Sequence, residues 1–457
     1  MKRNKRIIIG TVSVIILILI YGISLIVSSE GDNELIQSIE GTVLAINDDL
    51  LTIEDDNDTV YTFIAENVDV GVGEEIKLDY KGILNKEKNI QDTIIINYTI
   101  YSVLNEDDIP LSYMDNGIFS DYYKLAYNKL KTLSLDEKIG QLLLVRYPES
   151  NQVEDLKKYK FAGYVFFERD FRDKTKSGVL NMIDNVQNVS DIPLLTAVDE
   201  EGGNVVRVSS NPNLASYSFK SSKELYASGG MNAISEDTKE KSRLLKSLGL
   251  NLNLAPVVDV STNPSDYMYN RTIGENTVIT SEYAKTVIEA SKGTGVSYTL
   301  KHFPGYSNNV DTHTGSSTDT RSLSDIRTND LPPFEAGINA DAEAVLVSHN
   351  IVTSIDSSNP ASLSSGVHDL LRNDLNFTGV IITDDLSMGA TSSITDAAVK
   401  AVKAGNDLII TTDYEESFNS IKSSVSSGTL SENDIDRHVF RILAWKYYKG
   451  LMFENQK

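Results

Sequence analysis

Ionisable side chains are crowded into one stretch of this sequence, from Lys301 to His313. The stretch follows a strand-like apolar run and holds two of the five histidines of the chain, His302 and His313. Asp311 lies two residues before His313, where its carboxylate could orient the imidazole. Because imidazole exchanges protons near neutral pH, this pairing predicts a catalytic loop that transfers protons.

The composition limits the classes of function that need to be considered. The chain has 457 residues, which is enough for an anchor, a small domain and a barrel of about 250 residues. Its 42 basic and 65 acidic residues give a net charge of −23, which argues against nucleic acid as a partner, because phosphate binding depends on Lys and Arg. The absence of cysteine excludes disulfides, thiol nucleophiles and cysteine-bound metals.

The N-terminus has the pattern of a membrane anchor. Four basic residues lie within residues 1–6, and the 21 residues from Ile7 to Val27 carry no charge. About 20 apolar residues cross a bilayer, and a basic flank stays in the cytoplasm. A cleaved signal peptide is the rival interpretation, but its apolar region is usually about 7–15 residues long. We therefore expect residues 1–29 to form a single-pass anchor that holds an extracytoplasmic catalytic domain at the cell membrane.

Residues 30–110 are expected to form a small acidic β domain. They contain 20 acidic residues against four lysines, and their short β-branched runs are separated by Asp, Asn and Gly. Five or six such strands predict a small closed barrel, possibly of the OB type, which could bind oligosaccharide. A spacer that holds the enzyme away from the membrane is the favoured interpretation, because a fold does not define a function.

Residues 111–457 alternate between strand-like and helix-like segments, which predicts an α/β fold of the (β/α)8 TIM-barrel type. Helical runs are expected at Ser221–Ser247, Thr280–Lys292 and Ser324–Asn339. The eight expected strands are Leu142–Val145, Gly163–Phe167, Leu194–Val198, Leu252–Val260, Ser297–Leu300, Ala344–Val347, Gly379–Ile382 and Asp407–Ile410.

Polar clusters follow five of these strands, where a barrel of this type places its active site. The residues expected there are Asp199, Arg271, Lys301, His302, His313 and Asp384. Such groups can bind sugar hydroxyls, and an ionised Asp can attack an anomeric carbon. Structural roles stay open for single members: Asp384 could cap a helix, and Arg207 or Arg271 could pair with Asp199 or Asp259. No ligand spacing supports a metal, so neither metal nor cofactor is expected.

Four motifs in this order resemble glycoside hydrolase family 3, in particular its single-barrel β-N-acetylglucosaminidases, from about Leu135 to the C-terminus. The motifs are Ala197–Arg207, Leu252–Val260 with Asn270–Gly274, Lys301–Gly305 with Asp311–His313, and Ile382–Met388. The resemblance implies a retaining exo-β-N-acetylglucosaminidase that acts on peptidoglycan fragments or related cell-wall glycans.

The resemblance also implies individual roles. Asp384 would be the nucleophile, His313 the general acid/base and Asp311 its partner. The terminal N-acetylglucosamine would be bound by the remaining matched positions, which are Asp199, Arg207, Arg271, Lys301 and His302. His349 is expected to be structural or to support the site residues from behind, and His368 and His438 are expected on helix surfaces away from the site.

The sequence also departs from the family pattern. Tyr306, Ser307 and Asn308 stand where His-Gly-Asp is common, and Asn204 stands where Arg is frequent. Only residues 414–457 follow the eighth strand, so the acid/base is expected from the barrel and not from a second domain. A family 3 β-glucosidase or other β-glycosidase, and an inactive wall-glycan-binding protein, are the alternatives.

Overall fold

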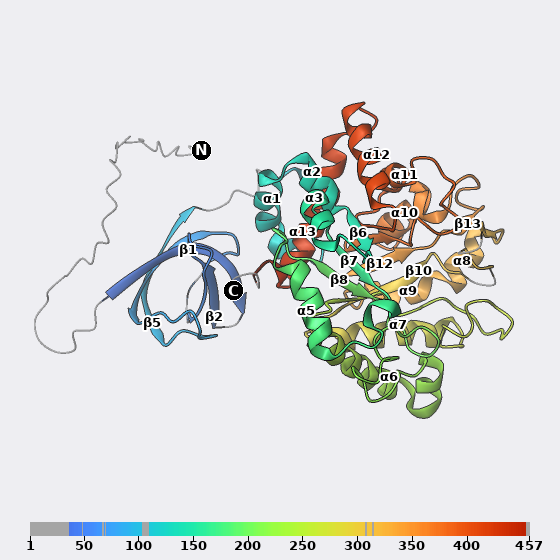
Figure 1. Cartoon of the computed structure of the whole chain (residues 1–457), viewed down its shortest axis with the longest axis horizontal. Coiled ribbons are helices and arrows are strands. Elements are labelled where there is room, and N and C mark those ends of the chain that lie inside the picture. The colour runs from blue at the N-terminus through green and yellow to red at the C-terminus, as the bar shows by residue number, and fades with distance from the viewer. Residues whose placement is uncertain are drawn as a thin grey trace, which may run out of the picture. The chain divides into compact units, whose positions relative to one another are not determined.

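The computed structural model describes residues 36–47, 49–65, 68, 70–102, 109–306, 309–312 and 315–453. The chain divides into two compact units, residues 1–102 and 103–457, which are considered separately (Figure 1). The expected anchor, residues 1–29, lies outside the described residues. Within the described ranges, no helix is long and apolar enough to cross a membrane. The anchor and the boundary expected after Pro110 stay predictions.

The first unit is an antiparallel sheet with the strand order β3-β2-β1-β4-β5. Its strands are β1 (Ile36–Asn47), β2 (Leu50–Glu54), β3 (Val60–Ile64), β4 (Glu75–Gly82) and β5 (Thr93–Ser102). The outer strands β3 and β5 also contact each other, so the sheet curls around a core that includes Val43, Phe63 and Leu78. The all-β character expected from the sequence is observed, whereas the OB type stays a prediction.

The second unit contains an eight-stranded parallel sheet that nearly closes into a barrel. The strands are β6 (Leu143–Arg146), β7 (Gly163–Phe166), β8 (Leu195–Val198), β9 (Leu252–Asn253), β10 (Ser297–Phe303), β12 (Ala344–Val347), β14 (Val380–Thr383) and β15 (Ile409–Thr411). The last strand, β15, pairs with the first, β6. Between β14 and β15 only a single bridge, Ile382 to Leu408, completes the ring. The barrel predicted from the sequence is confirmed in this nearly closed form.

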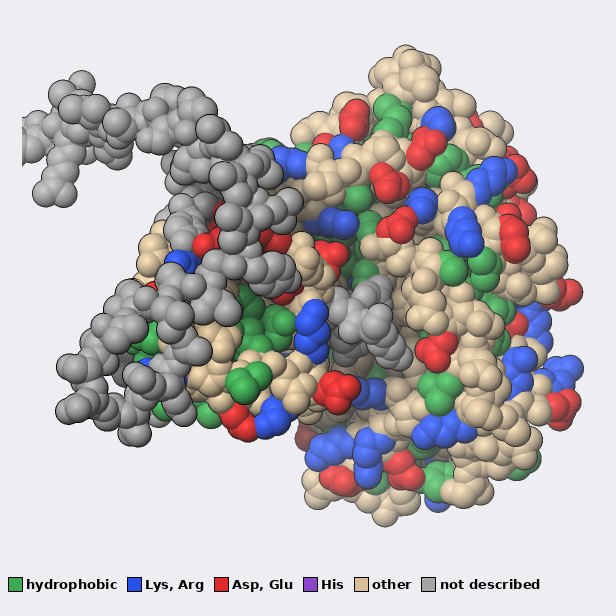
Figure 2. Space-filling view, turned by 60° about the vertical axis from the view of Figure 1, so that its left-hand side comes forward, with side chains coloured by type: hydrophobic (Ala, Val, Ile, Leu, Met, Phe, Trp, Pro, Cys, Tyr) green, Lys and Arg blue, Asp and Glu red, His purple; other side chains and the backbone are tan. Residues whose placement is uncertain are grey.

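Helices surround these strands (Figure 1). They are α1 (Tyr123–Thr132), α2 (Leu135–Gln141), α3 (Gln152–Tyr159), α4 (Glu168–Phe171), α5 (Lys176–Gln187), α6 (Ser222–Ser247), α7 (Thr277–Ser291), α8 (Leu323–Asn329), α9 (Leu331–Ile338), α10 (Ser365–Asp369), α11 (Ala397–Ala404), α12 (Tyr414–Ser426) and α13 (Glu432–Tyr448). Short 3-10 turns lie at Leu111–Tyr113, Ser120–Tyr122, Ala361–Leu363 and Leu451–Phe453, a π turn at Leu370–Asp374, and a two-stranded ladder joins β11 (Thr318–Asp319) to β13 (Ile351–Val352). One continuous apolar core runs through the unit. Figure 2 shows acidic and basic side chains interspersed over the visible face of this unit.

The structure corrects three details of the expected elements. The fourth strand is only Leu252–Asn253, because the chain then reaches Pro256, which has no N–H to give to a ladder. The fifth strand continues through Phe303, so Lys301 and His302 belong to a buried strand and not to a loop. The helix expected at Ser324–Asn339 is divided at Asp330 into α8 and α9.

A buried carboxylate, Asp407, fixes the C-terminal helix to the barrel. It accepts hydrogen bonds from Arg372 (2.6 Å), Arg441 (2.7 Å), His438 Nδ1 (2.9 Å) and the N–H of Ile381 (2.8 Å). His438 and His368 do lie on helices, but both are buried, so the expected surface location was wrong. Burial alone would raise the pKa of Asp407, but Arg441, Arg372 and His438 outweigh it and hold the pKa well below its usual range.

We expect Asp407→Asn to lower the free energy of unfolding of the barrel unit by about 3–5 kcal/mol, because it leaves the largely buried Arg372 without its counter-charge and Arg441 with only the more distant Asp115 carboxylate at 3.6 Å. Urea unfolding measures the change. The matched control is Asp191→Asn, which removes an exposed ion pair with Lys160 and should cost less than about 1 kcal/mol. Equal effects of the two substitutions would contradict this account.

Candidate active site

Four polar segments meet at the carboxyl ends of the barrel strands. Asp199 directly follows β8, Arg271 lies in the loop after β9, Lys301 and His302 end β10, and Asp384 follows β14. Parallel strands of a barrel end on one face, so segments far apart in the sequence become neighbours there. The structure thus brings together five of the eight residues that the sequence singled out.

Lys301 lies at the centre of this cluster. Its ammonium contacts Asp199 Oδ1 at 2.6 Å and Glu201 Oε1 at 2.7 Å, and only 3% of its side chain is exposed. Burial alone would lower the pKa of Lys301, but Asp199 and Glu201 outweigh it and hold the pKa above its ordinary value. Lys301 is therefore a fixed cation, which two carboxylates hold in one position.

Glu201 is a site residue that the sequence analysis missed. Its carboxylate binds Arg271 in bidentate fashion, with Oε1 2.6 Å from Nη2 and Oε2 3.0 Å from Nε. Burial would raise the pKa of Glu201, but Arg271 and Lys301 hold it far below its usual range. The available signal was the doubled Glu after Asp199, but the sequence did not show which Glu would face the cations.

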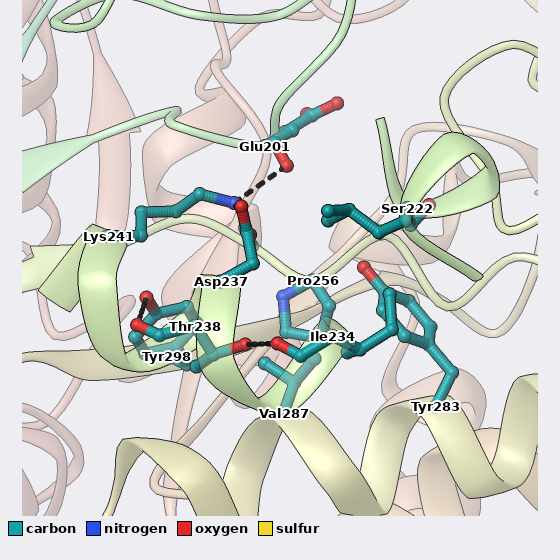
Figure 3. A pocket seen from close by; sticks show the side chains of 12 residues that line it. Glu201, Ser222, Ile234, Asp237, Thr238, Lys241, Pro256, Tyr283, Val287 and Tyr298 are labelled. Atoms are coloured by element: carbon teal, nitrogen blue, oxygen red, sulfur yellow. Dashed lines mark hydrogen bonds and ion pairs between the residues drawn. The ribbon is translucent and has the colours of Figure 1, made fainter. Parts of the chain in front are cut away.

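Behind Glu201 the chain is held by α6. Lys241 donates a hydrogen bond to the Glu201 carbonyl at 3.1 Å and pairs with Asp237 at 3.0 Å. Figure 3 shows these side chains around a small cavity of about 20 Å³, toward which Tyr283 and Ser222 also point. A space of this size holds about one water molecule. Helix α6 therefore fixes the backbone from which the Glu201 carboxylate reaches the cations.

Glu200, the neighbour of Glu201, binds backbone N–H groups and not cations. It is fully buried, and its carboxylate accepts the N–H groups of Arg207 and Val208 at 2.7 Å and of Ser209 at 3.1 Å. These bonds shape the loop that carries Arg207. The Arg207 guanidinium, however, is not bonded to Asp199 or Asp259, and it lies 5.7 Å from the ring of Phe167.

Asp259 orients His302. Its Oδ2 is 2.8 Å from His302 Nδ1, and its Oδ1 accepts the N–H of Tyr306 at 2.7 Å. A proton on Nδ1 that is donated to Asp259 leaves Nε2 as an acceptor, and Nε2 faces Arg271 Nη2 at 3.4 Å. Asp259 was considered as an arginine partner in the sequence, whereas the structure pairs it with this histidine.

The two acids after β14 also differ in environment. Asp384 is partly buried beside the cluster, and its Oδ1 accepts the N–H of Asp385 at 2.9 Å. The Asp385 carboxylate instead accepts the N–H of Ser387 at 2.9 Å and closes a turn. Burial would raise the pKa of Asp384, but His349, His302, the Asp385 amide and Lys301 outweigh it and lower the pKa below its ordinary value. Asp384 is thus available as a carboxylate.

His349 lies beneath this pair of acids. It is fully buried, its Nε2 is 2.9 Å from the Asp385 carbonyl, and its Nδ1 is 2.7 Å from Ser362 Oγ. The structural role expected from the sequence agrees with these contacts.

The loop after β10 is closed by a hydrogen bond across its base. The Tyr306 hydroxyl lies 2.5 Å from Thr312 Oγ1 and accepts the Thr312 N–H at 3.1 Å. Next to this bond, the hydroxyl of Tyr267 interacts with Asp311 and with Arg271. Asp311 is therefore near the cluster, whereas His313 lies outside the described residues. Tyr306, a departure from the family pattern, provides the bond that joins the two sides of this loop.

The described residues contain no group of three or more His, Asp or Glu arranged to hold a metal ion.

Comparison with known proteins assigns the family. A model of the glycosyl hydrolase family 3 N terminal domain matches residues 134–445. The chain belongs to glycoside hydrolase family 3. The resemblance inferred from the four motifs is confirmed, and the chain is a glycosidase.

Several family 3 relatives carry hexosaminidase names. The chain is 29% identical over 328 residues to Beta-hexosaminidase LpqI of Mycobacterium tuberculosis, covering 69% of this chain and 83% of that protein. It is 32% identical over 261 residues to a Beta-hexosaminidase of Stenotrophomonas maltophilia, covering 54% and 75%.

Among solved structures, a family 3 beta-N-acetylglucosaminidase from a Paenibacillus species superposes with a TM-score of 0.65 at 28% identity. The match covers 70% of this chain and 63% of that longer chain. The structure of M tuberculosis LpqI gives a TM-score of 0.63 at 26% identity, covering 69% and 95%. The barrel is thus shared with these enzymes, whereas substrate and mechanism are matters for proposal.

The pKa of Asp384 yields a pH prediction. If Asp384 is the nucleophile that the motif implies, it must be ionised, so kcat/KM on a neutral aryl glycoside should fall only at a pH below the usual pKa of an aspartate. His349→Gln removes the strongest of the influences that lower this pKa, so we expect the acidic limb to move to higher pH. The measurement is a pH profile of kcat/KM for both proteins, with their unfolding midpoints as the control. An unmoved limb in a folded variant would contradict the assignment.

Proposed function

We propose that the chain is a retaining exo-β-N-acetylglucosaminidase that removes terminal N-acetylglucosamine from peptidoglycan fragments or related cell-wall glycans. The observation that carries this proposal is the buried, charge-balanced cluster of Asp199, Lys301, Glu201 and Arg271 beside the ionised Asp384. The hexosaminidase names of several relatives support the choice of sugar.

The cluster would bind the terminal sugar. Asp199 has an oxygen that does not contact Lys301, and it can accept hydrogen bonds from a hydroxyl, while Arg271 and Lys301 donate. His302, held by Asp259, adds a ring nitrogen of defined orientation. Because Glu201 fixes both cations in advance, little conformational entropy is lost when the sugar binds.

The chemistry would proceed by double displacement. Asp384 attacks the anomeric carbon and forms a glycosyl ester, while the departing oxygen takes a proton from His313. The neutral imidazole of His313 then removes a proton from water, which attacks the same carbon and releases Asp384. Two inversions retain the anomeric configuration.

Asp311 would orient His313 in both steps. The bond between Tyr306 and Thr312 fixes the chain five residues before Asp311 and at the residue directly after it. A short closed loop of this kind limits the positions that the Asp311 carboxylate can adopt. The roles of Asp311 and His313 rest on the family motif and on this placement of Asp311.

Turnover of an aryl β-N-acetylglucosaminide tests the proposal. We expect Asp384→Asn to lower kcat at least about 1,000-fold, because it removes the nucleophile. His313→Ala should lower it by about 100- to 10,000-fold on 4-nitrophenyl glycosides, with partial recovery on a 2,4-dinitrophenyl glycoside, whose phenolate leaving group departs without a proton. Asp385→Asn is the matched control, since an amide oxygen can still accept the Ser387 N–H.

The two alternative functions predict different results in the same experiment. A β-glucosidase would prefer the aryl β-glucoside in a substrate panel, and an inactive binding protein would bind the sugar without turnover. Full activity of Asp384→Asn would contradict the proposed mechanism.

We also propose that residues 1–29 anchor the protein in the cell membrane with the barrel on the extracytoplasmic side. The support is the uncharged run from Ile7 to Val27 and its basic flank. In cell fractionation, the full chain should remain with the membrane after high-salt and carbonate washing, whereas a chain beginning at Glu30 should be released. Protease added to spheroplasts should cleave the barrel unit; protection of that unit would contradict the orientation.

A further inference from the structure

Three charged side chains meet at the base of the loop that carries Asp311. Arg321 lies just after β11, and its guanidinium joins two carboxylates. Its Nη2 is 2.6 Å from Asp319 Oδ2, and its Nη1 is 2.6 Å from Asp330 Oδ2. Both carboxylates are buried, and the guanidinium is partly buried. One cation is thus shared by two acids that belong to different segments of the chain.

Asp319 fixes the point at which the loop ends. It is the second residue of β11, which pairs with β13, and its carbonyl accepts the N–H of Thr353 at 2.9 Å. Both oxygens of its carboxylate are 3.1 Å from Arg321 Nε, and Oδ1 also accepts the Arg321 N–H at 2.9 Å. Burial would raise the pKa of Asp319, but Arg321 outweighs it and lowers the pKa. The end of the loop therefore has one position relative to the guanidinium.

Asp330 meets the point at which the loop begins. It lies between α8 and α9, and its side chain packs against Gly305, where an added Cβ would be 2.6 Å from Asp330 Oδ1. Gly305 has a φ of +123°, a conformation that suits glycine and few other residues. Burial raises the pKa of Asp330 to about 6, and Arg321 is the group that opposes the rise. Arg321 thereby helps to keep Asp330 charged at neutral pH.

These contacts hold both ends of the loop on a single cation. Asp311 lies between the ends, six residues after Gly305 and eight before Asp319. Fixing the two ends of a chain segment reduces the number of conformations that the residues between them can adopt. Inside this span, the bond between Tyr306 and Thr312 holds the residue next to Asp311. A change at the base of the loop is therefore passed on to the Asp311 carboxylate.

We propose that Arg321 is a positioning residue for the acid/base step, because it fixes both ends of the loop and so sets the place of the Asp311 carboxylate. It acts on the reaction through Asp311 and through the histidine that Asp311 orients. This inference rests on the proposed function and adds a residue to its proton transfer. A displacement of about 1 Å at a reacting group can lower a rate by about 100-fold, so a remote arginine can have a large effect.

Two aryl β-N-acetylglucosaminides separate proton transfer from sugar binding. The departing oxygen of the phenyl glycoside needs a proton, whereas that of the 2,4-dinitrophenyl glycoside does not. For Arg321→Gln we expect kcat/KM to fall by about 10- to 100-fold on the phenyl glycoside but by less than about threefold on the dinitrophenyl glycoside. Arg321→Lys keeps the charge but lacks the planar fork that reaches both acids, so it should recover part of the loss on the phenyl glycoside.

A matched control excludes a general effect of removing an arginine from this region. Arg327 is on α8 and forms an exposed ion pair with Asp374. Arg327→Gln should leave kcat/KM unchanged on both glycosides. The unfolding midpoint of each variant shows whether it is folded at the temperature of the assay.

Asp319→Asn provides a second test that does not depend on the folding of Arg321→Gln. It leaves Arg321 paired with Asp330, so it should give a smaller loss with the same selectivity for the phenyl glycoside. An equal loss on both glycosides in a folded variant, or no loss on the phenyl glycoside, overturns the positioning role. Hydrolysis of neither glycoside by the wild type, or equal losses on both in His313→Ala, overturns the proposed function instead.

Discussion

The contact of Lys301 with two carboxylates is the interaction on which the site depends. A buried ammonium is tolerated only when its charge is matched, and here the partners Asp199 and Glu201 both come from the segment after β8. Lys301 itself is part of β10, so its position is set by the strand ladder and by apolar packing. The same pairing fixes Glu201, which in turn fixes Arg271. The geometry of the barrel therefore sets the geometry of the site.

Adjacent acids in this protein serve different purposes because their surroundings differ. Glu200 folds the loop that carries Arg207, while Glu201 holds cations. Asp384 faces the cluster, while Asp385 closes a turn. Successive side chains leave the backbone in different directions, so neighbours of identical chemistry meet different partners. Residue type gives the range of possible roles, and the direction of the side chain selects one.

Most barrel strands could be predicted from the sequence because strands buried on both faces are near-continuous apolar runs, as in Ala344–Val347. Lys301 and His302 were placed in a loop instead, since polar residues usually end such a run. The pairing of Glu201 with Arg271, of Asp259 with His302 and of His438 with Asp407 was beyond prediction. Each of these partners lies in a different segment, and only closure of the barrel brings them together.

The ladder between β6 and β15 has a consequence for the synthesis of this chain on the ribosome. Leu143 pairs with Ile409, so the barrel cannot close until its last strand has been synthesised. Until then β6 presents an unpaired, apolar edge, the kind of surface that favours aggregation. Helices α12 and α13 follow β15, and α13 holds the barrel through the bonds of His438 and Arg441 to Asp407. Because α13 follows all eight barrel strands in the sequence, every strand that it must hold has already been made when it is synthesised.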